Sequence, residues 1–301
     1  MNDDRREPPN PSKPGTAEPQ RDGPLVRNIS DTALWVAHYR AQESARPDAV
    51  FRDPFARALA GERGAQIAAV QSFSNEHSWS FVARTYAFDR MIADEVRAGA
   101  DVVVNLAAGL DTRPYRMDLP PSLRWIEMDL PDILEYKERI LRSAVPMCRL
   151  ERVRVDLADA VARRAALSKA LIGTRRPVVV TEGLLIYLDA DQVKSLARDV
   201  HELGAASWIV DISSPVLLKM LRERGGAMIA AAGAPFKFAP DNGPAFFVPL
   251  GWQPVEIASL LKVAGRLKRL KGMMRFFAIL PDPKKLPPPR PWGAVVRLAR
   301  I

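Results

Sequence analysis

Acidic residues stand at or just after the ends of four short apolar runs, and these are the residues best placed for chemistry. They are Asp129, Asp156, Glu182 and Asp211. If the runs are parallel strands, ligands bind at their carboxyl ends, so the four acids would face a shared polar ligand. Each acid taken alone is explained equally well as a helix cap, and it is their repetition that favours a ligand.

The turn after the first apolar run, residues 106–113, narrows the class of ligand. It contains one glycine, Gly109, which lets the backbone approach a ligand closely. The turn has neither the three spaced glycines of a dinucleotide-phosphate loop nor the Lys-Ser/Thr pair of a triphosphate loop. A ligand with a ribose but no phosphate fits better. Asp129 would then accept the ribose hydroxyls, and Asp156 would hold an amino group of adenine.

The expected elements would bring these side chains to one edge of a sheet. Apolar runs alternate with helical spacing, which predicts a mostly parallel sheet with helices on both faces. We also expect a helix from Pro254 to Gly265, followed by a terminal hairpin of strands at 274–280 and 293–298 on the sheet edge. Five earlier strands are expected at residues 101–106, 124–129, 152–156, 177–182 and 206–211.

Helix start signals mark further elements. Ser30 is expected to cap a helix that runs towards Ser44, and a second helix is expected over residues 79–98. Asp189, with Gln192 three residues later, resembles a capping box at the start of the helix after the fourth strand.

Composition limits the class of protein. The 301 residues carry a net charge of +9, but residues 262–301 hold +10 and the rest −1, so the main fold should lack a basic face for nucleic acid. A single cysteine, Cys148, and three scattered histidines speak against a disulfide and a metal site. No apolar run is long enough for a membrane helix and no signal peptide is visible. We therefore expect a cytoplasmic protein with no metal and no membrane partner.

Two regions stand apart from the expected sheet. Residues 1–24 hold six prolines, nine charges and almost no apolar side chains, which predicts a disordered tail. Residues 25–301 are expected to form one domain. Within it, residues 25–98 would make a helical lid, and residues 213–250, rich in Gly, Ala, Pro and Phe, would make an apolar insertion over the pocket.

Several motifs, in the correct order, resemble the leucine carboxyl methyltransferase family, and most closely its large bacterial branch of S-adenosylmethionine-dependent methyltransferases. The resemblance covers roughly residues 28–300, which makes it far more specific than a lone glycine turn. The motifs are TALWVA at 32–37, FRDPF at 51–55, VART at 82–85 with Asp89, NLAAGLDTR at 105–113, EMDLP at 127–131 and TEGLLIY at 181–187.

The resemblance implies a class I methyltransferase fold, a seven-stranded α/β sheet whose antiparallel last strand is inserted near the edge. It implies S-adenosyl-L-methionine as cofactor. Arg84 would pair with the methionine carboxylate of the cofactor. Ala107 stands where many members have glycine, so the turn is expected to be less open. The other implied contacts are Gly109 at the methionine part, Asp129 at the ribose hydroxyls, Asp156 and Leu157 at the adenine, and Glu182 at the methionine amino group.

Together these features predict an O-methyltransferase acting on a carboxylate or hydroxyl of a small, apolar or aromatic metabolite, either free or held by an acidic carrier protein. A carboxylate acceptor needs no general base, whereas a hydroxyl needs one. No convincing base emerges. The candidates are Tyr187, expected at the border of the acceptor site, and His38, on the helix expected to roof the pocket. Each is also explained as a packed or solvated side chain.

Two other functions compete with this prediction. A methyltransferase-like protein could bind tRNA or another polyanion through its basic C-terminus, although nucleic acid is not expected as a partner. A nicotinamide-dependent oxidoreductase is disfavoured by the single-glycine turn. The basic residues near the end of the last expected helix have two further explanations. They could be solvated side chains that the helix dipole favours, or they could bind an acidic partner. They are Lys262, Arg266, Lys268, Arg269 and Lys271.

Overall fold

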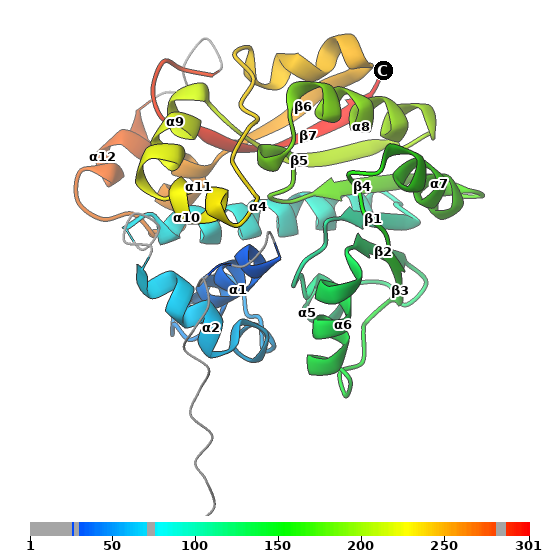
Figure 1. Cartoon of the computed structure of the whole chain (residues 1–301), viewed down its shortest axis with the longest axis horizontal. Coiled ribbons are helices and arrows are strands. Elements are labelled where there is room, and N and C mark those ends of the chain that lie inside the picture. Colours follow the sequence, from blue (N-terminus) through cyan, green and yellow to red (C-terminus); the bar gives the residue numbers. More distant parts are fainter. Residues whose placement is uncertain (1–25, 27–29, 71–75, 281–286) are drawn as a thin grey trace, which may run out of the picture.

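The computed structural model describes residues 26, 30–70, 76–280 and 287–301, so the tail expected at residues 1–24 lies outside the described residues. Within them the chain forms one seven-stranded sheet (Figure 1). Its strands are β1 (Val102–Leu106), β2 (Arg124–Asp129), β3 (Arg149–Arg154), β4 (Pro177–Thr181), β5 (Ser207–Ser213), β6 (Trp252–Ser259) and β7 (Gly293–Arg300).

The strand order is β3-β2-β1-β4-β5-β7-β6. The first five strands are parallel, and β7 is antiparallel to both of its neighbours, β5 and β6. The predicted α/β sheet and its inserted antiparallel strand are therefore confirmed. Because the five parallel strands all end at one edge of the sheet, the loops that follow them lie along that edge.

Helices lie on both faces of this sheet. Ahead of β1 come α1 (Asp31–Ser44), α2 (Ala56–Val70) and α4 (Ser78–Arg97). Those along the rest of the chain are α5 (Arg113–Arg116), α6 (Pro131–Ile140), α7 (Ala160–Leu171), η1 (Leu185–Tyr187), α8 (Ala190–Glu202), α9 (Pro215–Arg224), α10 (Gly226–Ala231), η2 (Gly243–Leu250), α11 (Leu260–Arg266) and α12 (Met274–Ile279).

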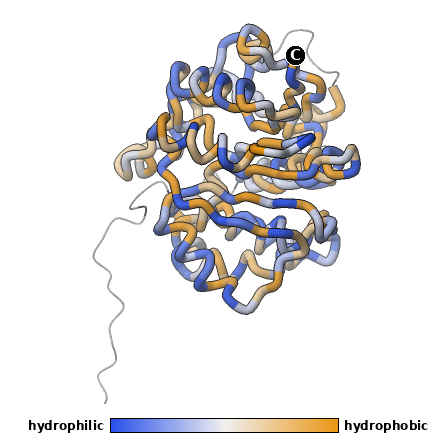
Figure 2. The backbone as a smooth tube through the Cα atoms, turned by 90° about the vertical axis from the view of Figure 1, so that its right-hand side faces the viewer, coloured by the Kyte–Doolittle hydropathy of each residue, from blue (hydrophilic) through white to orange (hydrophobic). Residues whose placement is uncertain are grey.

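Successive side chains of the buried strands pack alternately into two separate cores, one on each face of the sheet. Val102 and Val104 of β1 point to the face covered by α7 and α8, whereas Val103 points to the face covered by α4 and α11. Because both faces are covered, β1 and β4 are buried along their whole length, as continuous apolar runs require. Figure 2 shows hydrophobic and hydrophilic residues interspersed along the outer segments of the chain.

An apolar cluster joins the N-terminal helices to the segment between β5 and β6. Tyr39 of α1 stacks on Phe81 of α4 with ring centroids 4.7 Å apart, and Leu218 of α9 and Phe236 complete the cluster. Helices α1 and α2 are thus tied to the segment that contains α9 and α10. The proposed boundaries of the lid at residues 25–98 and of the insertion at 213–250 stay predictions.

Residues 252–259 form an edge strand, and the prediction of a helix starting at Pro254 is wrong. The residues alternate, with Trp252 and Ala258 buried and Val255 and Ile257 exposed. Proline is tolerated because β6 lies at the sheet edge, and the pairing register with β7 is irregular between Pro254 and Glu256. The helix begins six residues later, at Leu260.

The predicted terminal hairpin of residues 274–280 and 293–298 is also wrong. Residues 293–300 do form a strand, but both of its edges are already paired, with β5 and with β6. Residues 274–279 consequently find no free edge of β7 and form the short helix α12 instead.

Three smaller predictions have mixed outcomes. The capping box of Asp189 and Gln192 is confirmed at the start of α8. Ser30 occupies the N-cap position of α1, but its side chain makes no capping hydrogen bond. The third strand ends at Arg154, two residues before Asp156. Among the helices that the structure describes, none has the length and apolar character needed to cross a membrane.

The turn after β1 contains a strained residue that a substitution can relieve. Ala107 has a φ of +54°, in the left-handed region that costs a residue with a Cβ about 1–2 kcal/mol. Ala107→Gly should raise the free energy of unfolding by about 0.5–1 kcal/mol, because the gain is partly offset by the greater freedom of unfolded glycine.

Urea unfolding of purified protein measures this change. Ala108→Gly is the matched control: Ala108 is buried and lies outside the left-handed region, so this substitution should destabilise the chain. An Ala107→Gly variant that is no more stable than the unsubstituted chain would show that the turn is not strained.

Candidate active site

A cavity of about 400 Å³ lies at the carboxyl edge of the sheet. Residues at or after the ends of β1, β2, β4 and β5 form its polar side, and α1 and α4 cover it. Side chains of α9 and α12 and the residues around Phe236 form the rest of the wall. The described loops and helices therefore meet at one site, where the acids of the sheet edge were expected to converge.

Asp129, the last residue of β2, is held in the cavity wall by the backbone. Its Oδ2 accepts the Gly109 N–H at 2.6 Å, and its Oδ1 accepts the Leu130 N–H at 2.7 Å. Burial raises the pKa of Asp129, and these two hydrogen bonds do not fully offset it. A carboxylate held this way retains acceptor capacity, so it suits a ligand that presents hydroxyl donors.

Arg84 of α4 bridges Glu182, which follows β4, and Asp211, which lies within β5. Its Nε lies 3.1 Å from Oε1 of Glu182, and its Nη1 lies 3.2 Å from Oδ2 of Asp211. The Gly183 N–H donates to the other oxygen of Asp211 at 2.7 Å. Burial raises the pKa of Asp211, although Arg84 opposes the effect. These groups give the cavity a fixed rim of one cation and two carboxylates.

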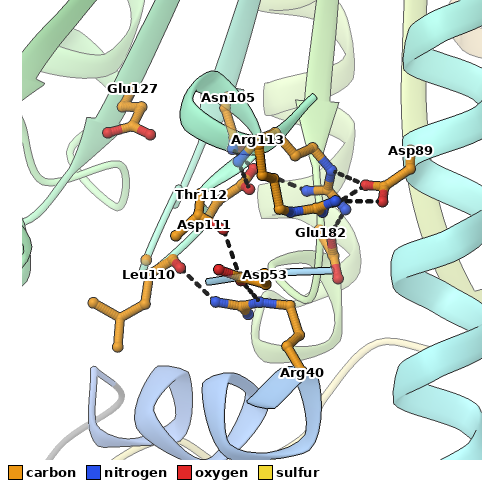
Figure 3. A network of polar contacts seen from close by, with 12 residues as sticks. Arg40, Asp53, Asp89, Asn105, Leu110, Asp111, Thr112, Arg113, Glu127 and Glu182 are labelled. Carbon is orange, nitrogen blue, oxygen red and sulfur yellow. Dashed lines mark hydrogen bonds and ion pairs between the residues drawn. The ribbon is translucent and has the colours of Figure 1, made fainter. Parts of the chain in front are cut away.

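Arg113 binds three carboxylates just outside this rim (Figure 3). Its guanidinium lies 2.6 Å from Asp89 of α4, 2.8 Å from Asp111 after β1, and 2.8 Å from Glu182 after β4. The side chain is only 3% exposed. Arg116 binds both oxygens of Asp89, at 2.7 and 2.8 Å. Arg113 thus fixes one oxygen of Glu182 while Arg84 holds the other.

A second polar cluster ties α1 to the turn after β1 (Figure 3). Arg40 binds Asp53 at 2.9 Å and donates to the Leu110 carbonyl at 2.6 Å. The Thr112 hydroxyl donates to the same carboxylate at 2.7 Å. A Cβ placed on Gly109 would lie 3.3 Å from the Cβ of Ala33 in α1, so α1 approaches the turn closely.

The structure brings most of the predicted cofactor residues to the cavity, but not all. Asp156 is exposed and accepts the Ala158 N–H, and Leu157 packs against the sheet core; neither lines the cavity. Their contact with adenine stays a prediction. Those that do line it are Arg84, Ala107, Gly109, Asp129 and Glu182.

The two candidate catalytic residues are placed differently. Tyr187 lines the cavity, with its ring 5.5 Å from that of Phe236. Burial raises the pKa of Tyr187, although a hydrogen bond with Thr32 and the charge of Arg84 oppose it. The phenol is therefore protonated at neutral pH. His38 does not line the cavity, and its Nε2 is 2.9 Å from the side-chain amide of Gln42.

Sequence reasoning missed the roles of Arg113 and His77. Arg113 belongs to the recognised motif at residues 105–113, two residues after Asp111, and its place in that motif was the available signal. His77 stands at the N-cap of α4 and is the histidine found among the described cavity-lining residues. Nothing in its sequence neighbourhood marks it as a site residue.

Arg269 corrects the interpretation of the basic segment as a solvated helix end. Its side chain is only 6% exposed, and it binds Glu43 of α1 at 2.7 Å and Asp48 at 3.0 Å. These carboxylates raise its pKa. One of these five cations thus connects the segment that follows α11 to the end of α1.

Known proteins resemble the chain in sequence. The profile of the leucine carboxyl methyltransferase family matches residues 33–201. A protein of Frankia alni, provisionally named an S-adenosyl-L-methionine-dependent methyltransferase, is 36% identical over 74% of this chain and 82% of its own length. A Streptomyces coelicolor protein with the same provisional name is 34% identical over 73% of this chain and 80% of its own.

Solved structures share the fold. A DUF574 family protein from Streptomyces avermitilis superposes with a TM-score of 0.58 at 17% identity, covering 87% of this chain and 96% of that one. The structure of a provisionally assigned methyltransferase from Thermobifida fusca gives 0.54 at 15% identity, with coverage of 92% and 96%. Fold and cavity define an S-adenosylmethionine-dependent methyltransferase of class I. The chain belongs to the leucine carboxyl methyltransferase family.

Arg113→Met removes the cation that three carboxylates share. It should lower the free energy of unfolding by about 3–5 kcal/mol near neutral pH, because it leaves buried charges uncompensated. In the unsubstituted chain, burial raises the pKa of Asp89 and Asp111, but Arg113 and Arg116 more than offset it and hold both values below the usual range. These carboxylates therefore stabilise the fold above about pH 4, and this contribution is lost as the pH falls.

In the variant, Asp89 keeps Arg116, but Asp111 loses its ion-pair partner, so burial should raise the pKa of Asp111 and the penalty should shrink as the pH falls from about 7 to about 5. Urea unfolding at both pH values measures it, with Arg175→Met, whose side chain is exposed, as control. A loss that is the same at both pH values, or no larger than in the control, would contradict a charge-sharing role for Arg113.

Proposed function

We propose that this methyltransferase transfers the methyl group to an oxygen, carboxylate or hydroxyl, of a small apolar or aromatic metabolite. One observation carries the proposal: the charged rim and a large apolar wall belong to the same cavity. The acids and Arg84 occupy the sheet edge, and the remaining wall offers few charges. The apolar side chains of that wall include Trp35, Val36, Phe81, Ile186, Leu217, Met220, Leu221, Phe236 and Phe238.

The residues at the charged rim fit S-adenosyl-L-methionine. The buried carboxylate of Asp129 suits the ribose hydroxyls, Arg84 suits the methionine carboxylate, and Glu182 suits the methionine ammonium group. When bound, the cofactor supplies a methyl group on a positively charged sulfur, which needs little assistance to depart. The polar groups of the chain therefore serve chiefly to bind and orient.

Catalysis in such a cavity rests on positioning. Holding an acceptor oxygen in line with the methyl group gives effective molarities of about 10⁵ M or more. The rim is pre-organised, because Arg84 and Arg113 fix both oxygens of Glu182. Thr32 and Ala33 of α1 form part of the cavity wall, so α1 limits the entry of water above the rim.

Two side chains of the cavity wall could interact with the acceptor oxygen or its proton. Tyr187 is protonated at neutral pH, so its hydroxyl can donate a hydrogen bond to the acceptor oxygen but cannot act as the base. If the acceptor is a hydroxyl, His77 is the candidate base, because it lines the cavity. A carboxylate acceptor is already ionised and requires neither residue as a base.

Ligand-induced thermal shifts test the cofactor assignments. S-adenosylmethionine and S-adenosylhomocysteine should raise the melting temperature, since a ligand well above its Kd stabilises the folded state, and NAD should not. Asp129→Ala should abolish the shift because it removes the carboxylate for the ribose. Asp132→Ala, an exposed acid in the first turn of α6, is the matched control. A full shift in the Asp129→Ala variant would refute the assignment.

Transfer of a labelled methyl group into an extract of the source cells tests the acceptor. We expect the label in a small product that partitions into organic solvent. An alkali-labile product whose formation is unaffected by His77→Gln identifies a carboxylate. An alkali-stable ether whose formation falls about 10²-fold or more in that variant identifies a hydroxyl. Label in RNA, in protein or on nitrogen would contradict the proposal.

A further inference from the structure

Helix α12 presents apolar side chains to the outside of the molecule. Met273 is 77% exposed, Phe276 64% and Ile279 82%, and Phe277 is also exposed. They lie within seven consecutive residues. Figure 1 shows α12 at the outer edge of the molecule, beyond α10 and α11. Exposed apolar side chains scattered singly are common, but a contiguous group on a projecting helix marks an interaction surface.

Cations surround this group. Arg266, Lys268, Lys271 and Arg275 are exposed, and no acid occurs between residues 257 and 280. In the part of the chain that the structure describes, these four side chains form no ion pair, in contrast to Arg269. The cations also gather in space: Lys262, Arg266, Lys268 and Arg275 line one hollow between α11 and α12, together with Ile279.

The same helix forms part of the wall of the active-site cavity. Met274 and Phe277 line the cavity, as do Leu280 and Lys262. The inner side of α12 therefore faces the site, while Phe276 and Ile279 face outward. An apolar molecule seated among the outer side chains would be next to the cavity wall.

We propose that the surface formed by α12 and the cationic hollow beside it binds an anionic lipid bilayer. The phosphates of the headgroups would occupy the hollow between α11 and α12. Met273, Phe276 and Ile279 would enter the boundary between headgroups and acyl chains. Short amphipathic elements with basic and aromatic side chains bind membrane surfaces in this way, through apolar burial and attraction to anionic lipids.

The shape of the surface favours a bilayer over a protein partner. Met273 and Phe276 are exposed and, unlike Ile279, do not line the hollow. A protein would need a pocket matched to each of them, whereas a bilayer deforms around them. The expectation of no membrane partner came from the lack of a spanning segment, and surface binding requires none.

This position would give a lipophilic acceptor a route from the bilayer past α12 into the cavity. That consequence rests on the proposed function, whereas membrane binding itself does not. Vesicle binding by a chain that shows no thermal shift with S-adenosylhomocysteine would therefore refute the cofactor assignments and leave the membrane surface standing.

Co-sedimentation of the full chain with vesicles tests the proposal. Binding to phosphatidylcholine vesicles that contain phosphatidylglycerol should be at least about tenfold tighter than to phosphatidylcholine alone, and should weaken with salt. The double variant Lys268→Glu/Lys271→Glu should lose at least about tenfold in affinity for the anionic vesicles, since each juxtamembrane cation contributes about fivefold. Phe276→Ser/Ile279→Ser should weaken binding at every salt concentration.

The matched control is Val161→Ser/Lys169→Glu on α7, an exposed apolar and cationic pair elsewhere on the molecule. It should bind vesicles as the unsubstituted chain does. All variants should retain the thermal shift with S-adenosylhomocysteine, which shows that they are folded.

Three outcomes would overturn the proposal. One is equal binding to neutral and anionic vesicles, and another is anionic binding that the α12 and α11 variants leave unchanged. The third is tighter, variant-sensitive binding to a soluble acyl carrier protein or to tRNA than to vesicles. That result would assign the same surface to a soluble acidic partner.

Discussion

The sharing of one buried guanidinium by three carboxylates is the interaction on which the active site depends. Arg113 joins Asp89 of α4, Asp111 after β1 and Glu182 after β4, which are elements far apart in the sequence. Each carboxylate would be costly to bury alone, and the arginine would be costly without them. Because the partners come from a helix and two strand ends, their pairing fixes the relative position of the helix and the sheet edge where the cofactor must bind.

The rim and the cover of the cavity are built on this frame. Arg84 can hold Glu182 and Asp211 because Arg113 has already fixed the far oxygen of Glu182. Helix α1, which covers the cavity, is attached separately to the turn after β1. The contacts run through Arg40, Asp53 and Thr112. Arg269, which follows α11, attaches that segment to Glu43 of α1. The polar contacts thus determine position, while the apolar cluster around Tyr39 and Phe81 supplies packing.

Much of the fold could be predicted from the sequence, because fully buried parallel strands produce unbroken apolar runs such as Val102–Val104. The C-terminal part could not. A proline at position 254 is typical of a helix start, but it is also tolerated on an edge strand, and only the pairing of β6 with β7 decides between them. Residues 274–279 have the apolar composition of a strand and form a helix because no edge of β7 is free.

Some residues of the active site could likewise be predicted from the sequence, and others could not. Asp129 and Glu182 could be predicted, because they stand at strand ends, where topology alone brings them together. Arg113 could not, since its role depends on carboxylates that approach it from α4 and β4. His38 does not line the cavity whereas His77 does, a distinction made by the placement of the helices and not by residue type.

A crystal structure of the chain with S-adenosylhomocysteine tests the account most directly. The account predicts the ligand in the cavity at the sheet edge, with its ribose hydroxyls on Asp129 and its amino group facing Glu182, and with Arg113 still bound to its three carboxylates. A ligand bound elsewhere, or bound there with Arg113 separated from Glu182, would contradict it.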